Sequence, residues 1–385
     1  MVSKPKVLVF VDWFLPGYKA GGPIKSVANI VQSLSKHVDF SIITSNIDFG
    51  EPEPYKHIQA NTWLQQDGFR VMYLDAAHQK LHVFRKLLQE ENYQTLYFNS
   101  LFSVPYTLLP LLANKLNGGN AEVVLAPRGM LGPGALNLKK NKKRLFLLGA
   151  KSAGLFRGIT WHASTSVEAE EIRAVFGGRV KVKVATNIAS AGTVSTDKIK
   201  TAENTAFFFL SRISPKKNLL GALELLAALQ VQRSVNFTIL GPVEDEKYWQ
   251  KCQEVISKLP ENIVVHYDGA IPNPKLPEVL KSFHFMLLPT YSENYGHVIV
   301  EAWASGCPVI ISDQTPWRNL EEEQVGWDLA LDNKQAFIEV LTKCVRMGNN
   351  TYQVLSSNTQ RFLQQRVITD EIIQQNKALF GVSHD

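Results

Sequence analysis

The sequence has few cysteines and no long apolar run. It contains three cysteines in 385 residues, Cys252, Cys307 and Cys344, an odd number without a C-x-x-C spacing. This pattern offers neither a disulfide framework nor a zinc ribbon, and it is typical of a reducing cytosol. No uninterrupted apolar stretch approaches the roughly 18–20 residues of a membrane span. With 24 glycines and 18 prolines, collagen-like and low-complexity classes are also excluded.

Positive charge is in modest excess. The formal net charge is +6 at pH 7, which favours an anionic partner such as nucleic acid, a phosphate group or an anionic membrane. A charge of this size also serves solubility alone, and both interpretations stay open. The first apolar run, Val7–Val11, ends at Asp12 and is too short for the core of a signal peptide. We therefore expect a cytoplasmic protein.

Apolar runs alternate with segments of helical period in two successive series. In the first half, strands are predicted at 6–11, 40–45, 95–99 and 122–126, with helices at 23–37, 81–91 and 106–116. In the second half, strands are predicted at 206–211, 237–240, 263–267, 285–288 and 308–312, with helices at 218–230, 245–259, 276–282 and 296–305. This alternation predicts α/β domains, each a parallel sheet with helices on both faces.

A polar stretch, Ala189–Asn204, separates the two series and lacks an apolar period. It is the predicted linker. We expect a first domain at 1–190, a linker at 191–204, a second domain at 205–360 and a C-terminal segment at 361–385. Ligands of such sheets bind beyond the carboxyl ends of the strands.

The most informative segment follows a predicted strand and opens a helix near Gly296. Glu293 lies in the loop before that helix, and Glu301 lies more than one turn inside it. Amides at a helix N-terminus attract an anion, and carboxylates accept hydrogen bonds from hydroxyl groups. The pattern suits a phosphate flanked by sugars, although a capping glutamate and a surface glutamate would have the same spacing.

Two other loops carry groups that suit a diphosphate. Arg212 follows a predicted strand and Lys217 precedes a helix, so two cations lie at a carboxyl strand end. A solvated basic loop is the alternative. Between the first strand and the first helix, Gly21 and Gly22 allow the backbone to approach a phosphate closely. That loop has neither the G-x-G-x-x-G nor the P-loop spacing, which excludes those two nucleotide motifs.

Together these segments resemble glycosyltransferase family 4 (glycosyl transferases group 1), a large group of retaining enzymes. The resemblance rests on ENYGHVIVE (Glu293–Glu301), on RISPKK (Arg212–Lys217) and on AGGPIKSV (Ala20–Val27). The stretches ILGP, YDGAI and LPTYSE also match. The resemblance covers essentially the whole second domain and the start of the first.

The resemblance implies a GT-B fold, in which two Rossmann-like doubly wound domains face each other across a donor-binding cleft. The first domain would serve the acceptor and the second a nucleotide-sugar donor. Arg212 and Lys217 would hold the donor diphosphate and stabilise the leaving nucleoside diphosphate. Glu301 would bind the ribose, and Glu293 the hydroxyls of the transferred sugar. The implied donor-binding set is Gly21, Gly22, Arg212, Lys217, Gly269, Glu293, Asn294, Tyr295, Gly296 and Glu301.

Further family properties follow as expectations. Gly22 would let the first domain close on the diphosphate, and Gly269–Pro272 would border the base. The C-terminal segment 361–385 would cross back onto the first domain. No cofactor and no metal are implied, because Arg212, Lys217 and helix amides would replace a divalent cation.

The chain departs from the family in one loop of the first domain. Many members carry a histidine there, near the transferred sugar, whereas the loop Ala126–Leu136 carries Arg128. Arg128 is a candidate for contacting the sugar or a phosphate of the acceptor. His162 is an alternative inward group, so the acceptor-side catalytic group stays open.

A basic segment, Asn137–Gly158, follows that loop. Its cations alternate with leucine and phenylalanine, a pattern typical of a membrane-surface binder. An ordinary helix with a solvated basic face is the alternative, and nucleic acid is disfavoured because no groove-reading motif accompanies the segment. The candidate membrane-surface residues are Lys139, Lys140, Lys142, Lys143 and Arg144.

We therefore predict a retaining glycosyltransferase that moves a hexose-type sugar from a nucleotide-diphosphate-sugar donor. The acceptor would be a saccharide or lipid-linked saccharide in polysaccharide or lipopolysaccharide assembly. Two alternatives are a nucleotide-sugar epimerase on the same fold and a non-catalytic carbohydrate- or nucleotide-binding protein. The expected location is the cytoplasm, and the inner face of the cytoplasmic membrane stays open.

Overall fold

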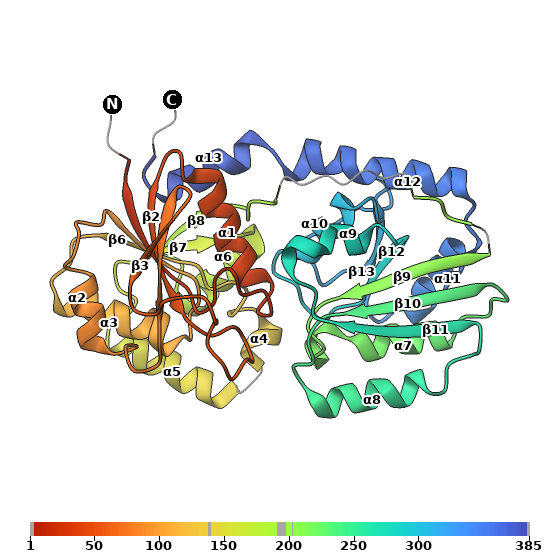
Figure 1. Ribbon diagram of the computed structural model, residues 1–385, viewed down its shortest axis with the longest axis horizontal. Coiled ribbons are helices and arrows are strands. Elements are labelled where there is room, and N and C mark those ends of the chain that lie inside the picture. The colour runs from red at the N-terminus through yellow and green to blue at the C-terminus, as the bar shows by residue number, and fades with distance from the viewer. Residues whose placement is uncertain (1–3, 138–139, 191–197, 202, 383–385) are drawn as a thin grey trace. The chain divides into compact units, whose positions relative to one another are not determined.

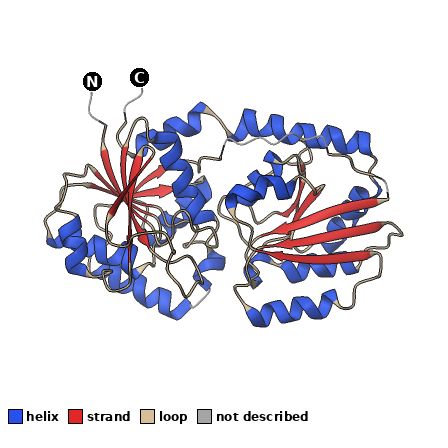
Figure 2. Cartoon of the chain, viewed as in Figure 1, coloured by secondary structure: helices blue, strands red, loops and turns tan. Residues whose placement is uncertain are grey.

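The computed structural model describes residues 4–137, 140–190, 198–201 and 203–382 (Figure 1). The chain forms two compact units. The first consists of Met1–Ile188 together with Asp370–Asp385, and the second consists of Ala189–Thr369. Each unit is a sheet with helices packed against it, as Figure 2 shows.

The first unit is built on an eight-stranded sheet of order β3-β4-β2-β1-β5-β6-β7-β8. The strands are β1 (Lys6–Phe10), β2 (Asp39–Ser45), β3 (Trp63–Gln66), β4 (Phe69–Leu74), β5 (Thr95–Phe98), β6 (Glu122–Leu125), β7 (Thr160–Ala163) and β8 (Lys181–Val184). Neighbouring strands are parallel, except that β3 and β4 form an antiparallel hairpin. Gly68, with a φ of 81°, supplies the left-handed conformation that its two-residue turn requires.

Helices cover both faces of this sheet. They are α1 (Gly22–Leu34), α2 (Leu81–Leu87), the π-helix η1 (Val104–Leu108), α3 (Leu109–Leu116), α4 (Pro133–Asn137), α5 (Lys140–Ser152), α6 (Ser166–Phe176) and α13 (Asp370–Leu379). Because side chains of a strand alternate in direction, β1 contributes to two cores. Val9 belongs to the same cluster as Val31 of α1, whereas Phe10 packs against Phe84 of α2.

The second unit is a six-stranded parallel sheet of order β11-β10-β9-β12-β13-β14. Its strands are β9 (Asn204–Leu210), β10 (Ser234–Leu240), β11 (Ile263–Gly269), β12 (Phe285–Leu288), β13 (Val309–Ser312) and β14 (Gly326–Leu329). Its helices are η2 (Pro215–Lys217), α7 (Leu219–Ala227), α8 (Glu246–Ile256), η3 (Asn273–Lys275), α9 (Leu276–Leu280), α10 (His297–Ala304), α11 (Lys334–Arg346), α12 (Asn349–Phe362) and η4 (Leu363–Val367). Phe207, Phe208 and Phe209 of β9 are fully buried, as expected for a central strand covered on both faces.

The predicted doubly wound architecture of parallel strands is confirmed in both units. One strand that was not predicted, β3, pairs antiparallel with β4 at the edge of the first sheet. Several elements were not predicted, because they are short or mix polar and apolar residues: β3, β4, β7, β8, β14, α6, α11 and α12.

Part of the predicted linker packs into the second unit, although 191–197 and 202 lie outside the described residues. Lys198 is buried, and its ammonium donates to the carbonyls of Leu280 and Phe283, both at 2.8 Å. Lys200 is also buried and donates to the carbonyl of Met347 at 2.7 Å. Two polar residues of this stretch are therefore core residues whose charges are satisfied by backbone oxygens.

The C-terminal segment contains the end of α12, then η4 and α13. The last of these belongs to the first unit. There Asn376 donates to the carbonyl of Thr186 at 2.8 Å, and the Phe380 ring packs edge-on against Phe40 and Tyr97.

Candidate active site

Two loops meet at the carboxyl edge of the second sheet. One follows β9 and contains η2, and the other follows β12 and leads into α10. The loops are adjacent because β9 and β12 are neighbouring strands. The amide of Tyr291 donates to the carbonyl of Lys216 at 3.0 Å, and the Asn218 side chain donates to the carbonyl of Pro289 at 2.8 Å. These bonds hold the two predicted motifs against each other.

An ion pair joins the two motifs. The ammonium of Lys217 donates to the carboxylate of Glu293, and the two side chains are only 11% and 17% exposed. The sequence predicted a role for each residue but not their contact. A partly buried pair of this kind holds a charged group in place more firmly than a surface pair does.

Arg212 lies in the same β9 loop and has a carboxylate partner of its own. Its guanidinium donates to Glu244 at 2.7 Å, and each side chain is one-third exposed. Glu244 was not predicted as a site residue. It follows β10, the other neighbour of β9, so the adjacency of the two strand ends is the signal that would have identified it.

The start of α10 is shaped by Gly296. This residue has a φ of 81°, and no side chain caps the helix. A Cβ at Gly296 would lie 2.8 Å from Ile299 Cδ1 and 3.1 Å from Glu293 Cγ. A larger residue at this position would therefore shift the Glu293 side chain. Glu301 lies one turn further on and is half-buried.

Aromatic side chains pack against Tyr295 and so hold the loop that carries Glu293. Tyr295 is buried, and its carbonyl accepts a hydrogen bond from the Trp317 indole at 2.5 Å. Its ring packs against His297 and Trp317, with centroids 4.8 and 5.4 Å away. Trp317 was not predicted, because nothing in its local sequence places it behind this loop.

Gly269 lies at the same edge of the second sheet. Its carbonyl accepts a hydrogen bond from the amide of Gly241 at 2.7 Å, which ties the end of β11 to the loop after β10. A Cβ at Gly241 would come within 1.9 Å of the Ser211 carbonyl oxygen, so the loops after β9 and β10 pass closer than a larger residue would permit. The predicted donor-binding residues of the second domain thus lie at the end of β11 or after β9 and β12, at the carboxyl edge of one sheet.

The glycine-rich loop of the first unit leads from β1 into α1. Gly21 has a φ of 69° and precedes the helix, and Gly22 is its first residue. The carboxylate of Asp48 accepts hydrogen bonds from the amides of Tyr18 and Lys19, at 3.0 and 3.3 Å. The loop is therefore held in shape by a buried carboxylate. The predicted role of Gly21 and Gly22 stays a prediction.

Arg128 lies at the carboxyl edge of the first sheet with its backbone in the left-handed region, at a φ of 55°. Its guanidinium donates to the Tyr97 hydroxyl at 2.8 Å, to Asn99 Oδ1 at 2.7 Å and to Asn187 Oδ1. These acceptors are neutral, so they fix the guanidinium without cancelling its charge. Such an arginine suits an anionic group.

His162, the alternative to Arg128 as an acceptor-side group, lies in the interior of the first unit. It is 1% exposed, and its two ring nitrogens lie 2.8 Å from the Tyr97 hydroxyl and 2.8 Å from the Ala185 carbonyl. Burial lowers its pKa to about 3, so the ring is neutral and occupied by internal contacts. The interpretation of His162 as an acceptor-side group is therefore wrong.

The basic segment forms α5. Lys139 lies outside the described residues, and Lys140 begins the helix. Lys142 and Arg144 are exposed. Lys143 instead donates to the carbonyl of Ala135 at 2.6 Å and lies 5.1 Å from the ring centroid of Phe102.

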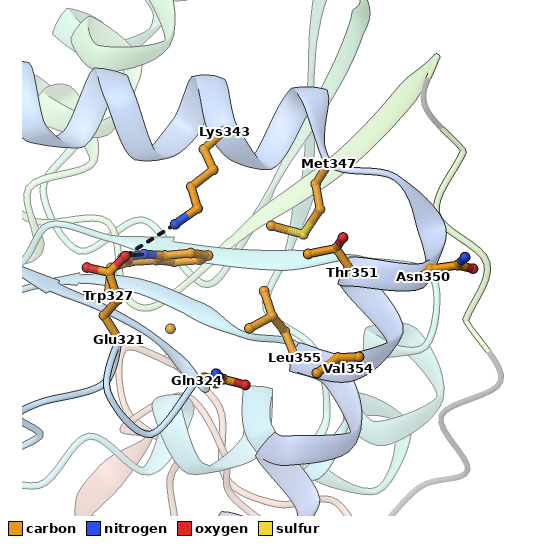
Figure 3. Close-up of a pocket in the computed structure, with 10 residues that line it drawn as sticks. Glu321, Gln324, Trp327, Lys343, Met347, Asn350, Thr351, Val354 and Leu355 are labelled. Atoms are coloured by element: carbon orange, nitrogen blue, oxygen red, sulfur yellow. Dashed lines mark hydrogen bonds and ion pairs between the residues drawn. The ribbon is translucent and has the colours of Figure 1, made fainter.

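The cavity in Figure 3 is not the predicted site. It has a volume of about 590 Å³ and is lined by residues of β14, α11, α12 and the preceding loop. Gly326 and Trp327 begin β14, so this cavity lies toward the amino end of that strand. The loop that carries Arg212 and Lys217 follows the carboxyl end of β9, at the opposite edge of the same parallel sheet. Inside it, Glu321 accepts hydrogen bonds from the Trp327 indole and the Lys343 ammonium, at 3.0 and 3.2 Å.

Two features are absent from the described residues. Among them, no three or more His, Cys, Asp or Glu side chains form a group that could hold a metal ion. No helix in the described part of the chain is both long enough and apolar enough to cross a membrane.

Comparisons with known proteins relate this geometry to one class of enzyme. Residues 195–362 match the family model described as Glycosyl transferases group 1. O-antigen chain mannosyltransferase B of Escherichia coli is 23% identical over 111 residues, which are 28% of this chain and 28% of that protein. The curated relative is thus matched over less than a third of its length.

Solved structures resemble nearly the whole chain. HepE (Alr3699) of Anabaena, solved in complex with UDP and glucose, has a TM-score of 0.72 at 17% identity, covering 97% of this chain and 98% of that chain. WaaG, a glycosyltransferase involved in lipopolysaccharide biosynthesis, has a TM-score of 0.67 at 12% identity, covering 97% and 100%. At such identities the likeness shows the fold.

The expected fold class is therefore confirmed, as is the expectation of a glycosyltransferase at the level of enzyme class. Residues 195–362 match the model of glycosyl transferases group 1, and the chain has the GT-B fold of two Rossmann-like units.

Proposed function

We propose that the protein is a retaining glycosyltransferase that uses a nucleotide-diphosphate-sugar donor. It transfers a hexose-type residue to a saccharide or lipid-linked saccharide acceptor during polysaccharide or lipopolysaccharide assembly. One observation carries the proposal: Arg212, Lys217, Glu293 and the start of α10 converge at one edge of the second sheet.

The two cations are the proposed diphosphate ligands. Each pairs with a carboxylate, Arg212 with Glu244 and Lys217 with Glu293. A diphosphate carries more negative charge than either carboxylate and would compete for both cations. When the bond to the sugar breaks, charge grows on the diphosphate oxygens, so fixed cations stabilise the transition state more than the ground state.

The proposed role of Glu293 follows from the same competition between the diphosphate and the carboxylates. Once the diphosphate engages Lys217, the Glu293 carboxylate is released to accept hydrogen bonds from sugar hydroxyls. Its negative charge also faces the positive charge that develops on the ring. We assign the ribose hydroxyls to Glu301, which lies one turn into α10.

The acceptor assignment is supported by two similarities. One relative is named as a mannosyltransferase of the O-antigen chain, and WaaG is described as a glycosyltransferase involved in lipopolysaccharide biosynthesis. Arg128 adds an anchored cation in the first unit, and we assign it to an anionic or hydroxyl group of the substrates.

The experiment that tests this function is a binding screen followed by product analysis. Thermal shift against a panel of nucleoside diphosphates and nucleotide sugars, beginning with uridine diphosphate, should reveal one base that stabilises the protein. A ligand at 100 times its dissociation constant adds about 2.7 kcal/mol. NMR of the glycoside product should then show the anomeric configuration of the donor. An inverted product would overturn the retaining assignment, and an epimerised free sugar formed without acceptor would indicate an epimerase.

We expect activity to persist in excess EDTA. The proposed diphosphate ligands are Arg212, Lys217 and helix amides, which supply positive charge without a divalent cation. Turnover should be equal in EDTA and in added magnesium. Loss of activity in EDTA with recovery on adding manganese or magnesium would contradict this assignment.

We also propose that α5 places the protein on anionic membranes. Leu145 and Leu148 are 74% and 55% exposed, and Lys142 and Arg144 are exposed beside them. Basic residues near an anionic surface contribute about 1 kcal/mol each, and the leucines supply insertion.

Replacing Lys142 and Arg144 by glutamate should abolish co-flotation with anionic vesicles. The same variant should still bind a nucleoside diphosphate, because the exchanged residues lie in the first unit. Lys36→Glu/Lys86→Glu, which changes two exposed lysines elsewhere on the first unit, is the charge-matched control and should float like the wild type. Equal flotation of all three proteins would show that α5 is only a solvated helix.

A further inference from the structure

An apolar groove in the first unit lies beside the exposed residues of α5 that we assign to the membrane surface. It is lined by residues of α5, α6 and the loop and short helix that precede α5, and its volume is about 530 Å³. Its aliphatic lining consists of Leu131, Leu136, Leu147, Leu148, Ala174 and Val175.

The groove opens onto exposed aliphatic surface. Leu148 lines it and is still 55% exposed, and Leu145, three residues earlier on the same helix, is 74% exposed. Residues three apart lie on one side of a helix. Exposed leucines beside an apolar groove offer surface that another molecule can cover.

The charged residues of the groove are mostly positive. Lys143, Arg144 and Lys151 line it together with one carboxylate, Glu171. Lys143 and Lys151 each donate to a backbone carbonyl, of Ala135 and Val175 respectively. These bonds hold the two ammonium groups at the groove. Among the described residues, no carboxylate forms an ion pair with Arg144, which is exposed.

We infer that this groove binds one hydrocarbon chain of a phosphate-bearing lipid, the lipid that carries the acceptor saccharide. The chain lies along the aliphatic floor, and the phosphate lies against Arg144 and the two anchored lysines. Charge complementarity selects this occupant, because an anionic head and an apolar tail match the two chemistries that the groove brings together. The inference rests on the proposed lipid-linked acceptor and identifies the groove that binds the lipid part of that acceptor.

Monomeric alkyl phosphates test the inference directly. Calorimetric titration of the full chain with hexyl, octyl and decyl phosphate, each below its micelle concentration, should show affinity rising with chain length. Each buried methylene contributes up to about fourfold. Inorganic phosphate should give no measurable heat, and decyl maltoside, which lacks the anionic head, should bind at least tenfold more weakly than decyl phosphate.

A pair of tryptophan substitutions locates the site. Ala174→Trp fills the groove from an exposed position of α6, so the fold should survive, and it should weaken decyl phosphate binding by at least tenfold. Val167→Trp, at a 65% exposed position of α6 outside the groove, should bind like the wild type. Leu145→Glu should impair vesicle flotation but leave decyl phosphate binding unchanged, because Leu145 does not line the groove.

Affinity independent of chain length, or unchanged binding by Ala174→Trp, would overturn the inference. Neither result would affect the proposed transfer reaction, since nucleoside diphosphate binding and transfer to a water-soluble acceptor would continue. Failure of the transferase function would appear instead as absence of nucleoside diphosphate binding, with alkyl phosphate binding intact.

Discussion

Arg212→Ala and Lys217→Ala are each expected to lower turnover on the order of a hundredfold or more. Both substitutions remove positive charge where the departing diphosphate gathers negative charge. Lys217→Ala also leaves the largely buried Glu293 carboxylate without its ion-pair partner, so a moderate loss of stability should accompany it. The measurement is kcat with saturating donor, together with thermal melts of each purified variant.

Lys281→Ala is the matched control for both variants. It removes one positive charge from an exposed ion pair of the same unit, with Glu278, and should keep wild-type turnover and melting temperature. If folded Arg212→Ala and Lys217→Ala proteins also turn over like the wild type, the diphosphate assignment is wrong.

The second large effect is a difference in the kinetic parameters that substitutions of Glu293 and Glu301 change. Glu301→Gln should mainly raise the donor KM, by about tenfold, because ribose contacts are the same in the ground state and the transition state. Glu293→Gln should lower kcat on the order of a hundredfold with little change in KM, because its contacts to the sugar strengthen as the bond breaks.

Binding of the bare nucleoside diphosphate separates the same two residues without any knowledge of the acceptor. Glu301→Gln should weaken it. Glu293→Gln should bind it at least as tightly as the wild type, because this ligand lacks the sugar and because Lys217 no longer has a carboxylate competitor. Equal weakening in both variants would contradict the division of roles while leaving the enzyme class untouched.

Sequence alone predicted the elements whose pattern is strong. β12 is a run of four fully buried residues, and Gly296 then opens α10, so both the strand and the helix were predicted close to their observed bounds. β7 and β8 were missed because TWHA and KVKV are four residues long and contain polar side chains. In these short strands, burial is decided by neighbouring elements rather than by their own composition.

Contacts between residues far apart in the chain could not be predicted from the sequence, for a different reason. Lys217 and Glu293 are brought together because β9 and β12 are adjacent. The order of strands in a sheet cannot be predicted from the local hydrophobic periodicity of the sequence. Glu244 was missed for the same reason, since it reaches Arg212 across neighbouring strand ends.

Buried polar residues also have partners that the sequence does not reveal. Lys198 and Lys200 made their stretch look like a linker, yet both ammonium groups bind backbone carbonyls in the second core. His162 looked like a reactive side chain, yet Tyr97 and Ala185 occupy both its nitrogens. Composition shows that such residues are polar but not whether the fold supplies their partners.

The central claim is that the loops after β9 and β12 hold a nucleoside diphosphate, and calorimetric titration of the full chain tests it most directly. At least one nucleoside diphosphate should bind the wild type with one-to-one stoichiometry. Lys217→Ala should weaken that binding by about tenfold or more, whereas Lys281→Ala should leave it unchanged. Absence of binding by every nucleoside diphosphate, or wild-type affinity in folded Lys217→Ala, would contradict the account.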